Sequence, residues 1–385
     1  MSKVEELLEK YNPDGVPNKL LVECSLIDYG YPFTSSMFTD DSSYIPIIRI
    51  RDVKPGKAST YYMGNYSKEY IVKRGDILVG MDGEFNLEKW NDIDSLLNQR
   101  VARITEMPSK STKGYLYHIL GPIFKKIERE ISGGSVKHLS VKIINSISIP
   151  LPHIKVQEEI VKILDSFTNL IDSLNEELSL RQKQFEYYRE KLLTFDESNY
   201  VKISSICKRI VSGGTPKTTI DRYYQGNIPW LRTEEVDFCY VYETKKHISE
   251  EAIANSSTKM IPVNCVIIAM YGATAAKCCI NKIPLCTNQA CCNLEIDDTL
   301  ALYKFVFFNI CKEYEKLKSL GEGSQNNISG QKIKDYRIPI PSLAIQQSIV
   351  EKLDAFESLI SSLKEEIALR QKQYEYYREK LLTFD

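Results

Sequence analysis

The sequence predicts an α+β protein in which two globular domains of mixed strands and helices are separated by two long helices, packed as an antiparallel coiled coil with pseudo-twofold symmetry. Three observations predict this architecture. One stretch of the sequence occurs twice, and its apolar residues follow a heptad spacing. The remaining segments show a weaker similarity to each other.

The repeated stretch is nearly identical in its two copies. Arg181–Asp196 reads RQKQFEYYREKLLTFD and Arg370–Asp385 reads RQKQYEYYREKLLTFD, so only Phe185 and Tyr374 differ. The match extends upstream to IPLPHIKVQEEIVKIL and IPIPSLAIQQSIVEKL. The duplication divides the chain into a first domain, a long helix, a second domain and another long helix, at residues 1–148, 149–196, 197–337 and 338–385.

Apolar residues in each copy are separated by alternating steps of four and three, as at Ile160, Leu164 and Phe167. This period, sustained over close to forty residues, predicts a continuous coiled-coil helix about 55–60 Å long. Two unrelated amphipathic helices, each packed on its own domain, are the alternative. Both copies instead place an arginine at the same seam position, Arg181 and Arg370, as expected if one interface was duplicated. Since domains and helices alternate along the chain, antiparallel pairing would bury both seams.

The two globular segments also correspond to each other. YIPIIRIRDV in the first matches NIPWLRTEEV in the second, and DILVGMDG matches CVIIAMYG. Both segments read as short strands rich in isoleucine and valine, separated by Gly, Ser, Thr and Asn loops. A longer helix is expected near Lys113–Ile131 in the first and near Leu302–Leu320 in the second. Since mostly loop residues differ, we expect two modules with one fold and different ligands.

The composition is that of an ordinary soluble protein of 385 residues, with 43% hydrophobic and 26% charged residues. No apolar run reaches membrane-spanning length and the start lacks the apolar core of a signal peptide, so we expect a cytoplasmic location. The ten cysteines contain no C-x-x-C spacing, which favours reduced thiols and no metal site. The net charge is −1, although the globular segments are slightly basic, so tight DNA binding would need clustered charge or a partner.

Motifs of common catalytic sites are missing from the sequence. It contains no phosphate-binding G-x-x-x-x-G-K-[ST] loop, no G-x-G-x-x-G after a strand, and no Asn/Asp-Pro-Pro-aromatic motif of an amino-methyltransferase. The four histidines, His118, His138, His153 and His247, are scattered without metal-ligand spacing. The chain therefore reads as a binding protein, and an enzyme acting alone is the disfavoured alternative.

The arrangement resembles the specificity subunits of type I restriction-modification systems over essentially the whole chain. The proline-rich approach to each long helix is similar to that family's, with Gln157 and Gln346 in the expected place. In the second domain GGTPKTT, IPWLRTEEV, the Gly272-Ala273-Thr274 turn, TNQA and GSQNNIS look like the family's target-recognition-domain markers. The first domain departs from them, since GYPFTSSMF stands where GGTPKTT would.

The resemblance implies a DNA-recognition subunit without catalytic activity of its own. Each domain would read one half of a bipartite, asymmetric site in double-stranded DNA, and the helices would set the gap between the halves. The implied partners are two methyltransferase subunits and two restriction subunits, with no membrane partner. S-adenosylmethionine, ATP and Mg are then expected on these partners, and no cofactor or metal on this chain.

Candidate base-reading residues are polar side chains of the marker loops, because Arg and Lys pair with guanine and Asn and Gln with adenine in the major groove. In the second domain they are Thr215, Lys217, Thr218, Arg232, Thr233, Thr274, Lys277, Gln325 and Asn326. In the first domain they are Arg49, Arg51, Lys54, Asn86, Lys89, Lys137 and His138. Each could instead be a loop residue that bonds its own backbone, and Asn98-Gln99 and Asn288-Gln289 could serve loop architecture. Trp230 is expected in the core.

The helix ends carry candidate partner-binding residues, namely Tyr187, Arg189, Tyr376 and Arg378. Near-identity at these positions cannot come from reading different half-sites. A surface that receives the same methyltransferase twice would explain it, and a shared helix-helix core is the alternative. We expect Tyr188 and Tyr377 on the seam. A coiled-coil scaffold whose two globular ends bind proteins is the rival function.

Overall fold

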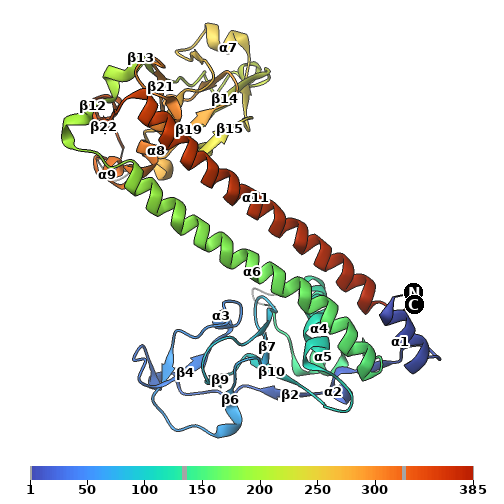
Figure 1. Cartoon of the computed structure of the whole chain (residues 1–385). Coiled ribbons are helices and arrows are strands. Elements are labelled where there is room, and N and C mark those ends of the chain that lie inside the picture. Colours follow the sequence, from blue (N-terminus) through green and yellow to red (C-terminus); the bar gives the residue numbers. More distant parts are fainter. Residues whose placement is uncertain (1, 132–136, 323–326, 385) are drawn as a thin grey trace. The chain divides into compact units, whose positions relative to one another are not determined.

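The computed structural model describes residues 2–131, 137–322 and 327–384. The chain forms two compact units: unit 1 comprises Met1–Asn175 and Glu365–Asp385, and unit 2 comprises Glu176–Lys364. Each unit contains one strand-rich domain and one end of each of the two long helices, α6 (Ile154–Leu192) and α11 (Leu343–Leu382) (Figure 1). The predicted α+β class and both long helices are confirmed. Within the described residues, no helix is long and apolar enough to cross a membrane.

The first domain, in unit 1, contains two small sheets beside helix α4 (Lys113–Glu130). One sheet has the order β2-β10-β7-β8, formed by Ser25–Tyr29, Val101–Glu106, Ile77–Gly80 and Leu87–Lys89. The other has the order β3-β5-β4-β9-β6, formed by Phe38–Thr39, Tyr61–Tyr62, Ile45–Ile48, Ser95–Leu97 and Ile71–Val72. Strands β4 and β9 run parallel.

The second domain, in unit 2, repeats the order of the central strands and differs in the strands at the sheet edges. One sheet has the order β13-β21-β18-β19-β15, formed by Cys207–Ser212, Cys291–Ile296, Val266–Ala269, Cys278–Asn281 and Cys239–Val241. The other has the order β16-β14-β20-β17, formed by His247–Ile248, Ile228–Leu231, Leu285–Thr287 and Met260–Ile261, with β14 and β20 parallel. The faint sequence correspondence between the two globular segments therefore reflects one shared fold. Trp230 is buried on β14, confirming its place in the core.

One expected helix is broken in two. The segment predicted as Leu302–Leu320 forms α8 (Tyr303–Lys312) and α9 (Tyr314–Ser319), separated at Glu313. The carboxylate of Glu313 is buried, accepts a hydrogen bond from the Tyr336 hydroxyl at 2.8 Å and pairs with Lys316 at 2.8 Å. A buried carboxylate must be paired. The backbone of Glu313 departs from helical geometry at the position where these two contacts hold its side chain, with ψ near 10°.

Each long helix carries a buried glutamine in its first turn. Gln157 accepts a hydrogen bond from the backbone N–H of Thr112 at 2.9 Å and donates to the carbonyls of Lys110 and Pro152. In unit 2, Gln346 makes the same three bonds with Leu302, Leu300 and Pro341. Both side chains are fully buried, and both connect the start of a long helix to the start of the domain helix, α4 or α8.

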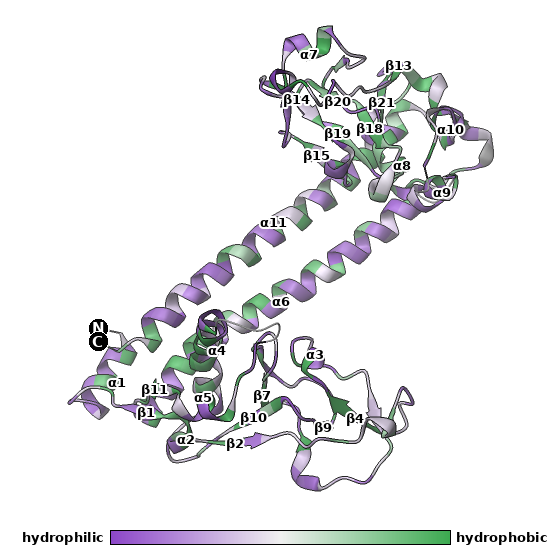
Figure 2. Ribbon diagram, turned by 180° about the vertical axis from the view of Figure 1, so that it is seen from behind, coloured by the Kyte–Doolittle hydropathy of each residue, from purple (hydrophilic) through white to green (hydrophobic). Residues whose placement is uncertain are grey.

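Within each unit the beginning of one long helix packs against the end of the other. In unit 1, Phe167 stacks on Tyr377 with ring centroids 5.2 Å apart, and Leu381 and Leu382 join the core around Ile160. In unit 2, Tyr188 stacks on Phe356 at 5.4 Å. This confirms the antiparallel pairing and the seam positions of Tyr188 and Tyr377. Figure 2 shows hydrophobic residues recurring among hydrophilic ones along both helices, which is consistent with an apolar seam on one face of each helix.

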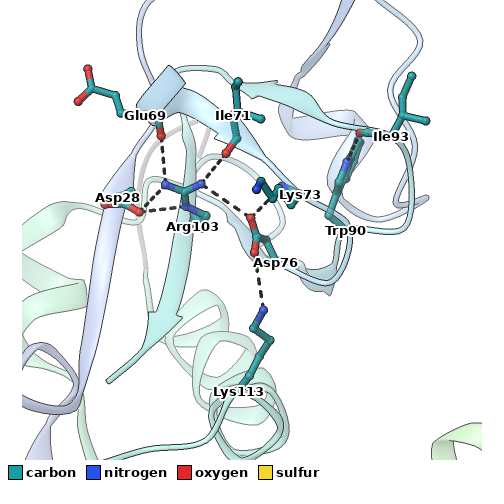
Figure 3. Close-up of polar contacts among 9 residues, drawn as sticks. All are labelled: Asp28, Glu69, Ile71, Lys73, Asp76, Trp90, Ile93, Arg103 and Lys113. Carbon is teal, nitrogen blue, oxygen red and sulfur yellow. Dashed lines mark hydrogen bonds and ion pairs between the residues drawn. The ribbon is translucent and has the colours of Figure 1, made fainter. Parts of the chain in front are cut away.

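A cluster around Arg103 joins the two sheets of the first domain (Figure 3). From β10, the Arg103 guanidinium donates twice to the Asp28 carboxylate on β2, at 2.8 and 2.9 Å, and to the carbonyl of Ile71 on β6 at 2.7 Å. It also lies 3.7 Å from Asp76, which pairs with Lys113. The corresponding residue of the second domain, Asn293, donates to the Val211 carbonyl and the Thr287 hydroxyl instead.

Replacing Arg103 should therefore destabilise unit 1 selectively. Arg103→Met removes the donors to the Asp28 carboxylate and to the carbonyls of Ile71 and Glu69, and we expect a loss of about 2 kcal/mol in the free energy of unfolding. The measurement is denaturant unfolding followed by Trp90 fluorescence in a Trp230→Phe background, since these are the only two tryptophans and one lies in each unit. The matched control is Arg209→Met, which removes the more exposed cross-strand pair with Glu295 in unit 2. Followed by Trp230 fluorescence in a Trp90→Phe background, it should cost about 0.5 kcal/mol. Equal losses would contradict the assignment.

Candidate nucleic-acid interface

In unit 2 the glycine-rich loop after β13 is pressed against the turn that joins β20 to β21. The backbone N–H groups of Gly213 and Gly214 donate to the carbonyls of Cys291 and Thr287, at 3.2 and 2.9 Å. A Cβ atom on Gly213 would lie 2.2 Å from the carbonyl oxygen of Asn288. The loop can approach this closely only because no side chain intervenes.

Two further loops converge on the same turn. Asn288 N–H donates to the carbonyl of Leu231 at the end of β14, at 3.0 Å. The Thr274 hydroxyl donates to the carbonyl of Thr233 at 2.8 Å, which joins the loop after β18 to the loop after β14. The Met270 N–H donates to the carbonyl of Ala290, also at 2.8 Å. Four loops that are distant in sequence thus form one surface at the ends of β13, β14, β18 and β21.

The candidate residues of the second domain lie on these loops. Thr215 bonds the side chain of Gln289, whereas Lys217 and Thr218 are exposed. Arg232 pairs with Glu234 at 3.4 Å, and Lys277 pairs with Asp237 at 2.6 Å. Thr233 and Thr274 are half-buried where their loops meet. Gln325 and Asn326 lie outside the described residues.

In the first domain the equivalent loops are held together by the same main-chain hydrogen bonds, although their residues differ. We call this set of main-chain bonds the loop frame. Gly30 and Tyr31 donate to the carbonyls of Val101 and Leu97, both at 3.0 Å, as Gly213 and Gly214 do in unit 2. Met81 N–H donates to the carbonyl of Arg100 at 2.8 Å, in the place of the bond between Met270 and Ala290. A Cβ atom on Gly30 would meet the carbonyl of Asn98. The departure of GYPFTSSMF from the marker motif therefore leaves the backbone scaffold intact.

A depression of about 320 Å³ opens on this frame in the first domain. It is lined by Arg49, Ile50, Arg51, Asn98, Gln99 and Arg100. Beneath it the Asp52 carboxyl is buried, and burial raises its pKa, although the backbone N–H of Arg49 bonds this carboxylate at 2.9 Å. Three of the residues that line this hollow are arginines, and arginine side chains are suited to guanine edges and phosphates.

Sequence reasoning missed Arg100, and it treated Gln99 only as an ambiguous loop residue. Arg100 has φ of 69°, rare for a residue other than glycine, and its side chain is 53% exposed. The Asp82 carboxylate links Arg100, at 3.5 Å, to His138, at 2.5 Å. Aligning Asn98-Gln99-Arg100 with Asn288-Gln289-Ala290 was the signal that could have found it, because an arginine replaces an alanine there.

The remaining candidates of the first domain are less closely grouped. Lys54 and Asn86 both contact Glu84, at 3.4 and 3.2 Å, and Lys137 donates to the carbonyl of Glu128 at the end of α4. Lys89 is turned toward the helices, with its amine 4.6 Å from the centroid of the Tyr117 ring and 3.8 Å from Asp165 of α6. Lys89 is therefore not brought to the surface that Arg49, Arg51 and His138 share with Arg100.

The predicted partner-binding residues divide into two kinds. Tyr187 and Tyr376 are each 60% exposed. Arg189 and Arg378 are half-buried, with guanidinium carbons 5.5 and 5.1 Å from the ring centroids of Phe185 and Tyr374 on their own helices. The tyrosines are thus available to a partner, while the arginines cover the seam.

Two copies of one scaffold that present unlike polar loops, on duplicated helices, define a two-domain recognition protein. In the part of the chain that the structure describes, no three His, Cys, Asp or Glu side chains could together hold a metal ion. The chain belongs to the type I restriction-modification DNA specificity family, whose domain model matches residues 26–180 and 196–369. The class is that of a specificity subunit and not of an enzyme.

Several known proteins are similar to this chain. The specificity subunit of the Escherichia coli type I restriction enzyme EcoR124I/EcoR124II is 30% identical, covering 100% of this chain and 97% of that protein. A putative type I specificity subunit of Haemophilus influenzae is also 30% identical, over 84% of this chain and 88% of its own length. Among solved structures, the type I S subunit from M. genitalium has the same fold, with a TM-score of 0.62 at 14% identity over 95% of this chain and 96% of that one.

The close approach of the glycine loop generates a prediction. Gly213→Ala should displace the loop, and with it the Gly214 carbonyl that accepts the Trp230 indole N–H at 3.1 Å. We expect a shift in Trp230 emission and a loss of about 1–3 kcal/mol in unit 2, with Trp90 emission unchanged. The control is Gly330→Ala, whose Cβ would meet nothing closer than the Met270 sulfur at 3.8 Å. An unshifted Trp230 spectrum in Gly213→Ala would contradict the packing argument.

Proposed function

We propose that this chain is the sequence-reading subunit of a type I restriction-modification complex, in which each domain reads one half of a bipartite, asymmetric site in double-stranded DNA. The observation that supports this most directly is the shared backbone frame with unlike side chains. A frame held by main-chain hydrogen bonds keeps its shape when loop residues change. Two such frames in one chain suit two half-sites of different sequence. A scaffold that binds proteins at both ends is not favoured, because the matched family is one of DNA specificity.

The chemistry of the two loop surfaces differs. In the first domain, Arg49, Arg51 and Arg100 surround one hollow, and an arginine fork pairs well with the O6 and N7 atoms of guanine. In the second domain the exposed groups of the glycine loop are a lysine and a threonine, Lys217 and Thr218. We infer that the first half-site is contacted mainly through guanidinium groups, and the second through a mixture of amine and hydroxyl groups.

Partners supply what this chain lacks. With a net charge of −1, it cannot neutralise many phosphates by itself. Two methyltransferase subunits would dock on the repeated helix ends through Tyr187, Arg189, Tyr376 and Arg378, and would bind S-adenosylmethionine. Two restriction subunits would bind ATP and Mg. The chain would carry no cofactor and would act in the cytoplasm, on a target adenine that the methyltransferase flips out of the duplex.

Half-site reading can be tested at Arg100. In the complex with its methyltransferase, Arg100→Ala should reduce methylation about 10–100-fold and relax sequence preference at one position of a single half-site, because one bidentate base contact contributes about 1–3 kcal/mol of discrimination. The measurement is the methylation rate on DNA libraries with either half randomised. Arg74→Ala is the control, since Arg74 is exposed beyond the opposite end of β7. If Arg100→Ala lowered the rate equally for every sequence, a phosphate contact would replace base reading.

The helices are proposed to set the gap between the half-sites. Inserting one heptad at matched places in α6 and α11 preserves the seam and adds about 10 Å. The preferred gap should then grow by about three base pairs, at about 3.4 Å each, with both half-site sequences unchanged. The measurement is methylation of DNA with variable gaps. A control with the heptad in one helix only should lose activity at every gap. An unchanged preferred gap in the doubly extended chain is the result that would exclude the spacer role.

A further inference from the structure

The one difference between the two copies of the helix-end repeat lies where each helix end meets a domain. In unit 1 the Tyr374 hydroxyl lies 2.9 Å from Nδ1 of His118 on α4. In unit 2 the equivalent residue, Phe185, packs against Phe308 on α8, with ring centroids 6.4 Å apart at 68°. The repeat therefore carries a hydroxyl only where the facing domain offers it a polar partner.

His118 and Phe308 occupy the same position in the two domains. The backbone N–H groups that bond the buried glutamines, those of Thr112 and Leu302, mark equivalent positions at the starts of α4 and α8. Counted from these, His118 and Phe308 fall in the same register. Both are almost fully buried, each with 1% of its surface exposed. Both members of the contact therefore differ between the units: the pair is Tyr374 with His118 in unit 1 and Phe185 with Phe308 in unit 2.

The polar pair in unit 1 is fully hydrogen-bonded. Nε2 of His118 lies 2.8 Å from the carboxylate of Asp165 on α6. Burial lowers the pKa of His118, against the opposing effect of Asp165, and burial raises the pKa of Tyr374. A neutral imidazole has one donor and one acceptor nitrogen, so the Tyr374 O–H donates to Nδ1 and the Nε2–H donates to Asp165. Phenylalanine at position 374 would leave Nδ1 buried without a partner.

The matching site in unit 2 is apolar. Phe308 belongs to the main core of that unit, and Phe185 packs against this core. Asp354, the repeat's counterpart of Asp165, is bonded at 2.6 Å by Lys304 of α8 and has no histidine to face. A hydroxyl added to Phe185 would find no histidine at the facing position, because Phe308 stands there. The two helix ends, otherwise nearly identical, are thus not interchangeable.

We propose that positions 185 and 374 assign each helix end to its domain: the surface of α4 around His118 takes an end with tyrosine, and the surface of α8 around Phe308 takes an end with phenylalanine. The partner of each surface is a helix end of this same chain. The assignment does not depend on what the loops bind. Its consequence is that a domain moved to the other position meets the wrong ring unless the facing residue changes with it.

Exchanging the two rings in the full-length chain tests the proposal. Tyr374→Phe and Phe185→Tyr each introduce the residue that the other copy carries naturally. Hydrogen exchange resolved by mass spectrometry reads α4 and α8 separately. We expect Tyr374→Phe to speed exchange in α4 about tenfold with α8 unchanged, and Phe185→Tyr to do the reverse, as loss of one buried hydrogen bond or burial of one unpaired hydroxyl predicts. The controls are Tyr376→Phe and Tyr187→Phe, whose exposed rings should change neither helix.

Second-site changes separate matching from general destabilisation. Adding His118→Phe to Tyr374→Phe, which recreates the aromatic pair of unit 2, should restore most of the protection in α4. In a His118→Leu background, Tyr374→Phe should have no more effect than Tyr376→Phe, because the acceptor is already gone. The proposal is overturned if Tyr374→Phe matches its control in the unmodified chain, or if the His118 and Tyr374 substitutions act additively.

Discussion

A buried amide at the start of each long helix fastens the helix to its domain, and the arrangement of each unit depends on that joint. The Gln157 side chain has its acceptor and both donors occupied by backbone groups of Thr112, Lys110 and Pro152. Removing it would take this partner from three backbone groups, at about 1–3 kcal/mol for each group that is buried. Because the same amide bonds the first turn of α4, it fixes the register between α4 and α6. Every later contact between those helices, including that of His118 with Asp165, depends on this register.

Gln346 makes the same joint in unit 2. In both units the backbone determines the shape of the loops, and the loop side chains differ. Main-chain bonds hold the loop frame in both domains, so side chains on the loops are free to differ without altering the fold. This explains how Gly30-Tyr31 and Gly213-Gly214 occupy the same place although the motifs around them share little. Shape is specified by glycines and buried amides, and recognition by the residues between them. The glycines and buried amides are therefore repeated in both domains, whereas the polar side chains between them differ.

The parts of the fold that follow a period could be predicted from the sequence. Apolar spacing predicted the heptad seam. The alternation of domains and helices predicted the antiparallel pairing, and the matching strand segments predicted one fold for both domains. The loop frame of the first domain could not be predicted, because its bonds join backbone atoms and leave no residue signature. The break at Glu313 was missed for a similar reason, since its carboxylate is buried by tertiary contacts with Tyr336.

The candidate site shows the same limit. Residue type selected Arg49, Arg51 and His138, which the structure brings to one surface, and it also selected Lys89, whose amine turns toward Tyr117 and α6. Arg100 was overlooked because nothing in its local sequence indicates a left-handed backbone or an ion pair with Asp82. Direction of a side chain depends on tertiary packing, and short strands such as β8 give too little alternation to determine it.

One hydroxyl is enough to distinguish two nearly identical helix ends. Leaving a buried acceptor unpaired costs about 1–3 kcal/mol, which corresponds to a preference of about 5-fold to 150-fold at equilibrium. Domains are stable by only about 5–15 kcal/mol, so such a difference is a large fraction of what holds a unit together. The rest of the repeat can then remain the same in both copies, while Tyr374 and Phe185 alone keep each end with its own domain.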